Sequence, residues 1–221
     1  MGNEVILRAH TSLKELFQTL GQNITVLQPS DPVPICDFHT YLMSVPYLLK
    51  QELENLPSFQ SYLSVPSNSE VRLPSNHARK IRVGVAWYGN RRHANDHNRS
   101  CRFSDIKPLL ELEKIEWVSL QKEPVSEQKR EIVDLSGQIK SFADTAAIIN
   151  QLDLVISVDT AVAHLAGALG KTVWVMLPFA SDWRWLTERA DSPWYPTARL
   201  YRQKSPGDWH SVITSIKSDL N

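Results

Sequence analysis

The sequence lacks a surplus of charge of either sign. Its 221 residues carry 24 Lys and Arg against 24 Asp and Glu, so no basic field is available to hold a nucleic acid or an anionic membrane by charge alone. No apolar run comes near the roughly 18 residues that a membrane-spanning helix needs. We therefore expect no nucleic-acid partner and no transmembrane segment, and any anionic ligand must be held by a local cluster of donors.

Cysteine and glycine motifs are equally sparse. Cys36 and Cys101 are far apart in a chain without a recognisable secretory leader, so we expect free thiols and a cytoplasmic location. No Gly-x-Gly-x-x-Gly follows an apolar run, and no acidic residue stands at the ribose-reading distance from one. These absences argue against a dinucleotide-dependent dehydrogenase.

From Ile81 onward, short apolar runs alternate with longer amphipathic segments, which is typical of a parallel sheet with crossover helices. The runs predict strands at Ile81–Trp87, Ile115–Leu120, Leu154–Val158, Thr172–Leu177 and Arg199–Arg202. The amphipathic segments predict helices at Phe103–Leu112, Phe142–Gln151, Ala161–Leu169 and Asp208–Leu220. The fold class is therefore α/β, with a doubly wound Rossmann-like lobe over residues 76–221.

Residues 1–75 have a different character. Apolar runs at Val5–Leu7 and Ile24–Leu27 flank a helical segment near Leu13–Leu20, and a proline-rich stretch follows. The polar, aperiodic stretch Pro66–Asn76 is typical of a linker. We expect a partial first lobe followed by that linker.

The junction after Val158 is the most informative segment. The strand Leu154–Val158 ends in Asp159-Thr160 and runs directly into a helix of small residues that starts at Ala161. Ligands of parallel sheets collect outside the carboxyl ends of the strands, and the free amides at a helix start favour phosphate. His164 lies four residues after Thr160, on the same helix face. The junction therefore predicts a diphosphate or sugar site made by Asp159, Thr160, Ala161 and His164.

Two further loops carry candidate ligands. The loop Tyr88–Ser100 holds several Arg residues that could clamp a diphosphate, and Arg184 follows another strand, where it could meet phosphate while a neighbouring Trp stacks on a base or sugar. His93 and His97 are four apart, but no third ligand completes a metal site and Asn95-Asp96 favours a turn. We expect no metal.

A family resemblance rests on these segments. Asp159-Thr160-x-x-x-His164, followed by Leu-Ala-Gly-Ala-Leu-Gly, is similar to the donor-binding motif of family 9 glycosyltransferases, the heptosyltransferases. Ala161 stands where that family often has Gly. Four other segments resemble the branch of the family that ends many bacterial tetratricopeptide-repeat proteins: Val83–Asn90, His97–Ser100, Leu177–Trp185 and Trp194–Pro196.

The resemblance implies the second lobe of a two-lobed GT-B fold. It implies transfer of a sugar from a nucleotide-diphosphate donor to a hydroxyl of a glycan or protein, with the donor as a substrate and no further cofactor. By resemblance, Asn90 and Arg99 join Arg184 in holding the diphosphate. The nucleoside candidates are Gln121, which is otherwise a solvated loop residue, Asp144, which otherwise caps its own helix, and Trp185.

The catalytic base is not identified. The resemblance implies a glycine-rich loop followed by Asp in the first lobe, and no such segment precedes Val5; Asp31 and Asp37 are unsupported substitutes. Two hypotheses stay open: a glycosyltransferase or its donor-binding portion, and a non-catalytic nucleotide-sugar-binding module.

Overall fold

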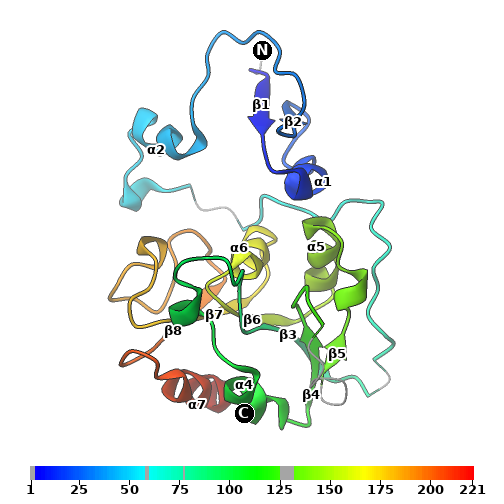
Figure 1. The fold of residues 1–221 in the computed structure, drawn as a ribbon, viewed down its shortest axis with the longest axis vertical. Helices are drawn as coiled ribbons and strands as arrows, with labels where there is room; N and C mark the ends of the chain where they lie inside the picture. The colour runs from blue at the N-terminus through cyan, green and yellow to red at the C-terminus, as the bar shows by residue number, and fades with distance from the viewer. Residues whose placement is uncertain (1–2, 58–59, 77, 125–131) are drawn as a thin grey trace.

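The computed structural model describes residues 3–57, 60–76, 78–124 and 132–221. Within these ranges an all-parallel sheet of six strands is covered by helices on both faces (Figure 1). Its strands are β3 Ile81–Ala86, β4 Ile115–Ser119, β5 Val133–Asp134, β6 Leu154–Val158, β7 Val173–Leu177 and β8 Ala198–Arg202. The helices of this lobe are α3 Asp96–Arg99, α4 Phe103–Leu110, α5 Phe142–Asn150, α6 Ala161–Ala168 and α7 Trp209–Leu220.

The strand order β5-β4-β3-β6-β7-β8 confirms the doubly wound fold. The chain winds outward from β3 to β5, then crosses to β6 and winds outward to β8. The winding direction therefore reverses between β3 and β6, which pair in parallel with Val85 opposite Ile156. In open α/β sheets, the crevice at such a reversal is where ligands bind.

The helices bury apolar stripes on opposite faces of the sheet. On one face, α5 contributes Ile148 and Ile149 and α6 contributes Ala163 and Ala166 to a single core cluster. On the other face, α4 and α7 pack against the sheet and each other through side chains that include Ile106 and Ile216. The small residues of α6 from Ala163 to Ala168 are buried, whereas Ala161 is exposed at the helix start.

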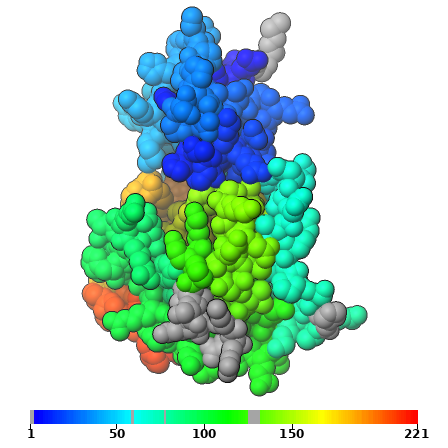
Figure 2. Space-filling view, turned by 45° about the vertical axis from the view of Figure 1, so that its right-hand side comes forward, coloured from blue at the N-terminus to red at the C-terminus, as the bar shows by residue number. Residues whose placement is uncertain are grey.

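The N-terminal segment forms a small unit above the α5 and α6 side of the lobe (Figures 1 and 2). Strands β1 Val5–Arg8 and β2 Ile24–Leu27 pair in parallel, and α1 Lys14–Phe17 lies between them in the chain. Helix α1 is shorter than the predicted Leu13–Leu20. Residues Thr11–Leu13 form a 3-10 turn before it, and the Thr19 and Leu20 amides after it bond three residues back, to Leu16 and Phe17. Leu16 is buried in the same core cluster as α5.

Two stretches join this unit to the lobe in different ways. Residues 66–76 have no regular secondary structure, but Val71 is buried and its carbonyl accepts from the Gln151 side chain at 3.1 Å. By contrast, residues 33–53, which include α2 Val45–Leu48, expose many large apolar side chains, among them Ile35, Phe38 and Tyr47.

No helix in the described part of the chain is long and apolar enough to cross a membrane.

We expect Gly84→Ala to destabilise the lobe. A Cβ at Gly84, in β3, would lie 2.4 Å from Leu152 Cδ1 and 2.7 Å from Leu120 Cδ1, and overpacking of this kind costs about 1–3 kcal/mol of unfolding free energy. Urea denaturation would measure the loss. Gly137→Ala is the matched control, because a Cβ there meets nothing within 4 Å. Equal stability of the two variants would contradict the tight packing of β3.

Candidate functional site

Two cavities open at the carboxyl ends of the central strands. The larger, of about 1040 Å³, extends from the loop after β3 to the start of α5, and the smaller, of about 270 Å³, lies between the start of α6 and the loop after β7. Arg99, Thr160 and Ala161 line both cavities. These three residues, called here the shared wall, are all among the predicted site residues.

The start of α6 provides the amide part of the shared wall. Thr160 occupies the N-cap position, but its side chain makes no capping bond to the helix. Its hydroxyl instead lies 3.2 Å from Ser157 Oγ. The positive end of α6 is therefore not neutralised by its own cap residue, and its first residues line both cavities.

Arg99 provides the cationic part of the shared wall. Its Nη1 donates to the Asp159 carbonyl at 3.1 Å, and its Nε lies 3.3 Å from Asp96 Oδ1 in a largely buried ion pair. A Cβ at Gly89 would lie 2.7 Å from Arg99 Nη2 and 2.9 Å from Thr160 Cγ2. The lack of a side chain at Gly89 thus lets the loop after β3 close directly on the β6–α6 junction.

The rest of that loop places further cations at the larger cavity. Asn90 Oδ1 accepts from the Arg92 amide at 3.0 Å, forming a local turn. Asn90, Arg91 and Arg92 line the cavity, and Arg91 lies 5.1 Å over the Tyr88 ring. The loop therefore presents Asn90 on the same cavity as Arg99; that the two hold a diphosphate stays a prediction from resemblance.

His164 lines the smaller cavity with its ring held on three sides. Its Nδ1 lies 3.0 Å from the Tyr195 hydroxyl, and its Nε2 lies 3.8 Å from Asp159 Oδ1. The ring stacks on buried Trp185, with centroids 5.1 Å apart and planes 18° apart. Burial lowers the pKa of His164, an effect that Asp159 opposes and Arg184 reinforces.

Arg184 also lines the smaller cavity. Its Nη1 is 2.8 Å from Asp182 Oδ1, and its guanidinium lies 4.7 Å over the Trp183 ring. Asp182 also accepts from the Arg184 amide, which fixes the start of this short turn. The smaller cavity is therefore lined by both acidic and basic groups: Asp159, Asp182, Arg99, Arg184 and His164.

The three predicted nucleoside contacts already bond or pack within the fold. Gln121 is buried and lines the larger cavity, but its Oε1 accepts from the Trp87 amide at 2.9 Å and its Nε2 donates to the Tyr88 carbonyl at 3.2 Å. Asp144 Oδ2 accepts from the amides of Lys140 and Ser141, completing the N-terminal capping box of α5. Neither Asp144 nor the buried Trp185 is among the described residues that line the two cavities.

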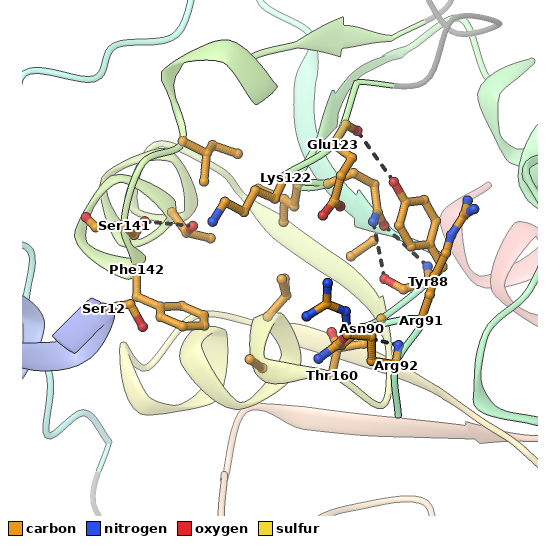
Figure 3. A pocket seen from close by; sticks show the side chains of 18 of the residues that line it. Ser12, Tyr88, Asn90, Arg91, Arg92, Lys122, Glu123, Ser141, Phe142 and Thr160 are labelled. Atoms are coloured by element: carbon orange, nitrogen blue, oxygen red, sulfur yellow. Dashed lines mark hydrogen bonds between the residues drawn. The ribbon is translucent and has the colours of Figure 1, made fainter. Parts of the chain in front are cut away.

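Several lining residues were not among the predicted site residues. Lys122 and Glu123 follow β4, Lys140 and Ser141 precede α5, and Ser12 reaches the cavity from the N-terminal unit. Figure 3 shows Ser12 and Ser141 across the larger cavity from Tyr88 and Arg91. The sequence offered a signal for Lys122 and Glu123, which lie just after a predicted strand, and for Lys140 and Ser141, which precede a predicted helix. It offered none for Ser12.

Comparisons with known proteins match parts of this chain. Residues 118–175 match the model of glycosyltransferase family 9 (heptosyltransferase). Protein FlbA of Caulobacter vibrioides is 29% identical over 153 residues, which cover 63% of this chain. The chain spans about a quarter of the length of that curated relative. A comparison with solved structures gives no match.

The lowered pKa of His164 can be tested directly. We expect its NMR titration midpoint to lie below the ordinary value of 6.5, because burial outweighs the attraction of Asp159. The ring would then be neutral at pH 7.5, and binding of an anion beside it would raise the midpoint, so that affinity increases as the pH falls. Loss of one signal in His164→Ala gives the assignment. A midpoint above 6.5 would mean that Asp159 dominates.

Proposed function

We propose that the chain is a glycosyltransferase-like protein that binds a nucleotide-diphosphate sugar for transfer to a hydroxyl acceptor on a glycan or protein. The observation that carries the proposal is the shared wall. It combines an arginine with a helix start whose cap residue leaves the first amides free, and it lies between a large and a small cavity. Such a wall suits a diphosphate, because Arg and helix amides both favour phosphate oxygens.

The two cavities suit the two ends of such a donor. The larger has apolar lining at Leu120, Ile139 and Phe142 for a base, and polar lining at Ser141 and Thr145 for a ribose. The smaller carries carboxylates and cations together, which matches sugar hydroxyls because each hydroxyl both donates and accepts hydrogen bonds. The nucleoside would thus occupy the larger cavity and the sugar the smaller.

The chemistry follows from the same wall. Sugar transfer leaves negative charge on the departing diphosphate, and preorganised cations and amides stabilise that charge without reorganising. Arg99 and the start of α6 are held in place before any ligand arrives, by the Asp159 carbonyl and by the sheet. We propose that these groups, with His164, replace a divalent metal.

The positions of the two candidate bases, Asp31 and Asp37, favour a second candidate function. Asp31 is held by the Gln28 amide and Lys14, contacts that lower its pKa. Neither Asp31 nor Asp37 is among the described residues that line the cavities, where the N-terminal unit contributes Ser12. This arrangement favours a non-catalytic nucleotide-sugar-binding module as the alternative, and an association with tetratricopeptide repeats stays a prediction from resemblance.

Calorimetric titration with UDP, GDP and ADP, each beside its monophosphate, tests the proposal. We expect one diphosphate to bind more tightly than its monophosphate and the binding to survive added chelator. A hydrolysis assay with the matching nucleotide sugar then separates the two candidate functions, since hydrolysis requires a working active site and binding alone does not. No binding by any of these nucleotides would refute both.

The contribution of His164 to donor binding has a matched control within the chain. We expect His164→Ala to weaken binding of the preferred nucleoside diphosphate by about 1–3 kcal/mol, as for loss of a hydrogen bond to a charged group. His97→Ala removes an exposed imidazole from α3, away from both linings, and should leave the affinity unchanged. Equal affinities of the two variants would remove His164 from the site.

A further inference from the structure

Tyr195 is a buried residue with a polar group directed at the site. It lies before β8, far from α6 in the sequence, and its hydroxyl is 3.0 Å from His164 Nδ1. Tyr195 is not among the described residues that line either cavity. Its hydroxyl therefore meets the smaller cavity through His164, which lines that cavity.

The position of this hydroxyl is fixed by packing on α6. A Cβ at Gly167 would lie 2.4 Å from the Tyr195 ring, so the ring rests directly on the helix where no side chain is present. Gly167 is three residues after His164 and shares its helix face. The ring thus lies against the turn that follows His164, and its hydroxyl extends back to the imidazole.

Trp194, the neighbour of Tyr195, holds another residue that lines the smaller cavity. Trp194 Nε1 donates to the Arg184 carbonyl at 2.8 Å, and Trp185, next to Arg184, stacks on the His164 ring. The adjacent residues Trp194 and Tyr195 therefore hold two lining residues, Arg184 and His164, in fixed relation. This arrangement leaves the imidazole little freedom to rotate.

The charges around the ring decide which nitrogen carries the proton. On the Nε2 side, Asp159 Oδ1 lies at 3.8 Å, so an unprotonated Nε2 would direct its lone pair at a carboxylate. On the Nδ1 side, the Tyr195 hydroxyl can donate, and burial raises the pKa of this phenol, which keeps its proton in place. Tyr62 lies beside the phenol and raises its pKa further. Both sides favour Nδ1 as acceptor and Nε2 as donor.

We propose that Tyr195 is a positioning residue that fixes His164 as the Nε2–H tautomer and directs this N–H into the smaller cavity. The role of that N–H in holding a donor oxygen rests on the proposed function, whereas the tautomer itself does not. A neutral His164 can then donate to an anionic or hydroxyl oxygen without first taking up a proton.

Nitrogen-15 NMR of the full chain without nucleotide tests the tautomer. At pH 7.5 we expect the His164 ring to show a protonated Nε2 and an unprotonated Nδ1 in the wild type, and a mixture of tautomers in Tyr195→Phe. The Phe variant keeps the ring on Gly167, and a thermal melt checks that it folds. Tyr201→Phe, which removes a phenol bonded to Asp219 on the other face of the sheet, should leave the His164 signals unchanged. A wild-type ring protonated at Nδ1, or an unchanged tautomer in Tyr195→Phe, would overturn the proposal.

Calorimetry with the preferred nucleoside diphosphate tests the consequence for binding. Tyr195→Phe should weaken binding roughly 3- to 10-fold, the effect of losing one hydrogen bond. It should cause no further loss in a His164→Ala background, because it acts through that ring. An additive loss would overturn the positioning role. If no nucleotide binds the wild type, the proposed function fails, while the spectra still decide the tautomer.

Discussion

The bond from Arg99 to the Asp159 carbonyl is the contact on which both cavities depend. It ties the end of the loop after β3 to the end of β6, across the point where the sheet reverses its winding direction. Because Gly89 has no side chain, the loop can close until Arg99 and Thr160 form one surface. A looser junction would separate the cation from the helix start and merge the two cavities into an open groove. The proposed diphosphate site therefore depends on a hydrogen bond from the Arg99 side chain to a main-chain carbonyl.

The strands of the lobe were predictable because their patterns are local. The predicted and observed bounds of β3, β4, β6, β7 and β8 differ by one residue or less at each end, since buried parallel strands are short apolar runs with clear limits. Strand β5 was missed because Val133-Asp134 is too short to form such a run. Helix α1 was predicted too long because an apolar pattern does not distinguish an α-helix from the 3-10 turns that flank it. Local patterns thus define the elements more reliably than their ends.

The residues of the candidate site also differ in how far the sequence could predict them. Asp159, Thr160, Ala161 and His164 come from one continuous segment, and the sheet edge brings Asn90, Arg99 and Arg184 to the same two cavities. Ser12 reaches the larger cavity only through packing of the N-terminal unit on the lobe, and Tyr195 contacts His164 from a segment distant in the chain, so no pattern of spacing could predict either contact. Gln121 and Asp144 show that a residue near the site in the sequence can have a structural role. Each follows or starts an element near the site, but each already bonds main-chain groups there, and their predicted contact with a nucleoside stays a prediction.

Ser12 gives the larger cavity a property that the smaller one lacks. It belongs to the N-terminal unit, whereas the other described residues that line this cavity belong to the sheet lobe. The unit is held on that lobe by Leu16 in the common core. It is also held through Ser64, which bonds Thr19 and follows Tyr62 and Leu63, whose amides both donate to the Ala168 carbonyl of α6. A ligand that touches Ser12 together with groups of the lobe would add to this attachment. By thermodynamic reciprocity, tighter seating of the unit would in turn strengthen the ligand's hold. Ligand binding in the larger cavity and attachment of the N-terminal unit to the lobe would thus be coupled equilibria.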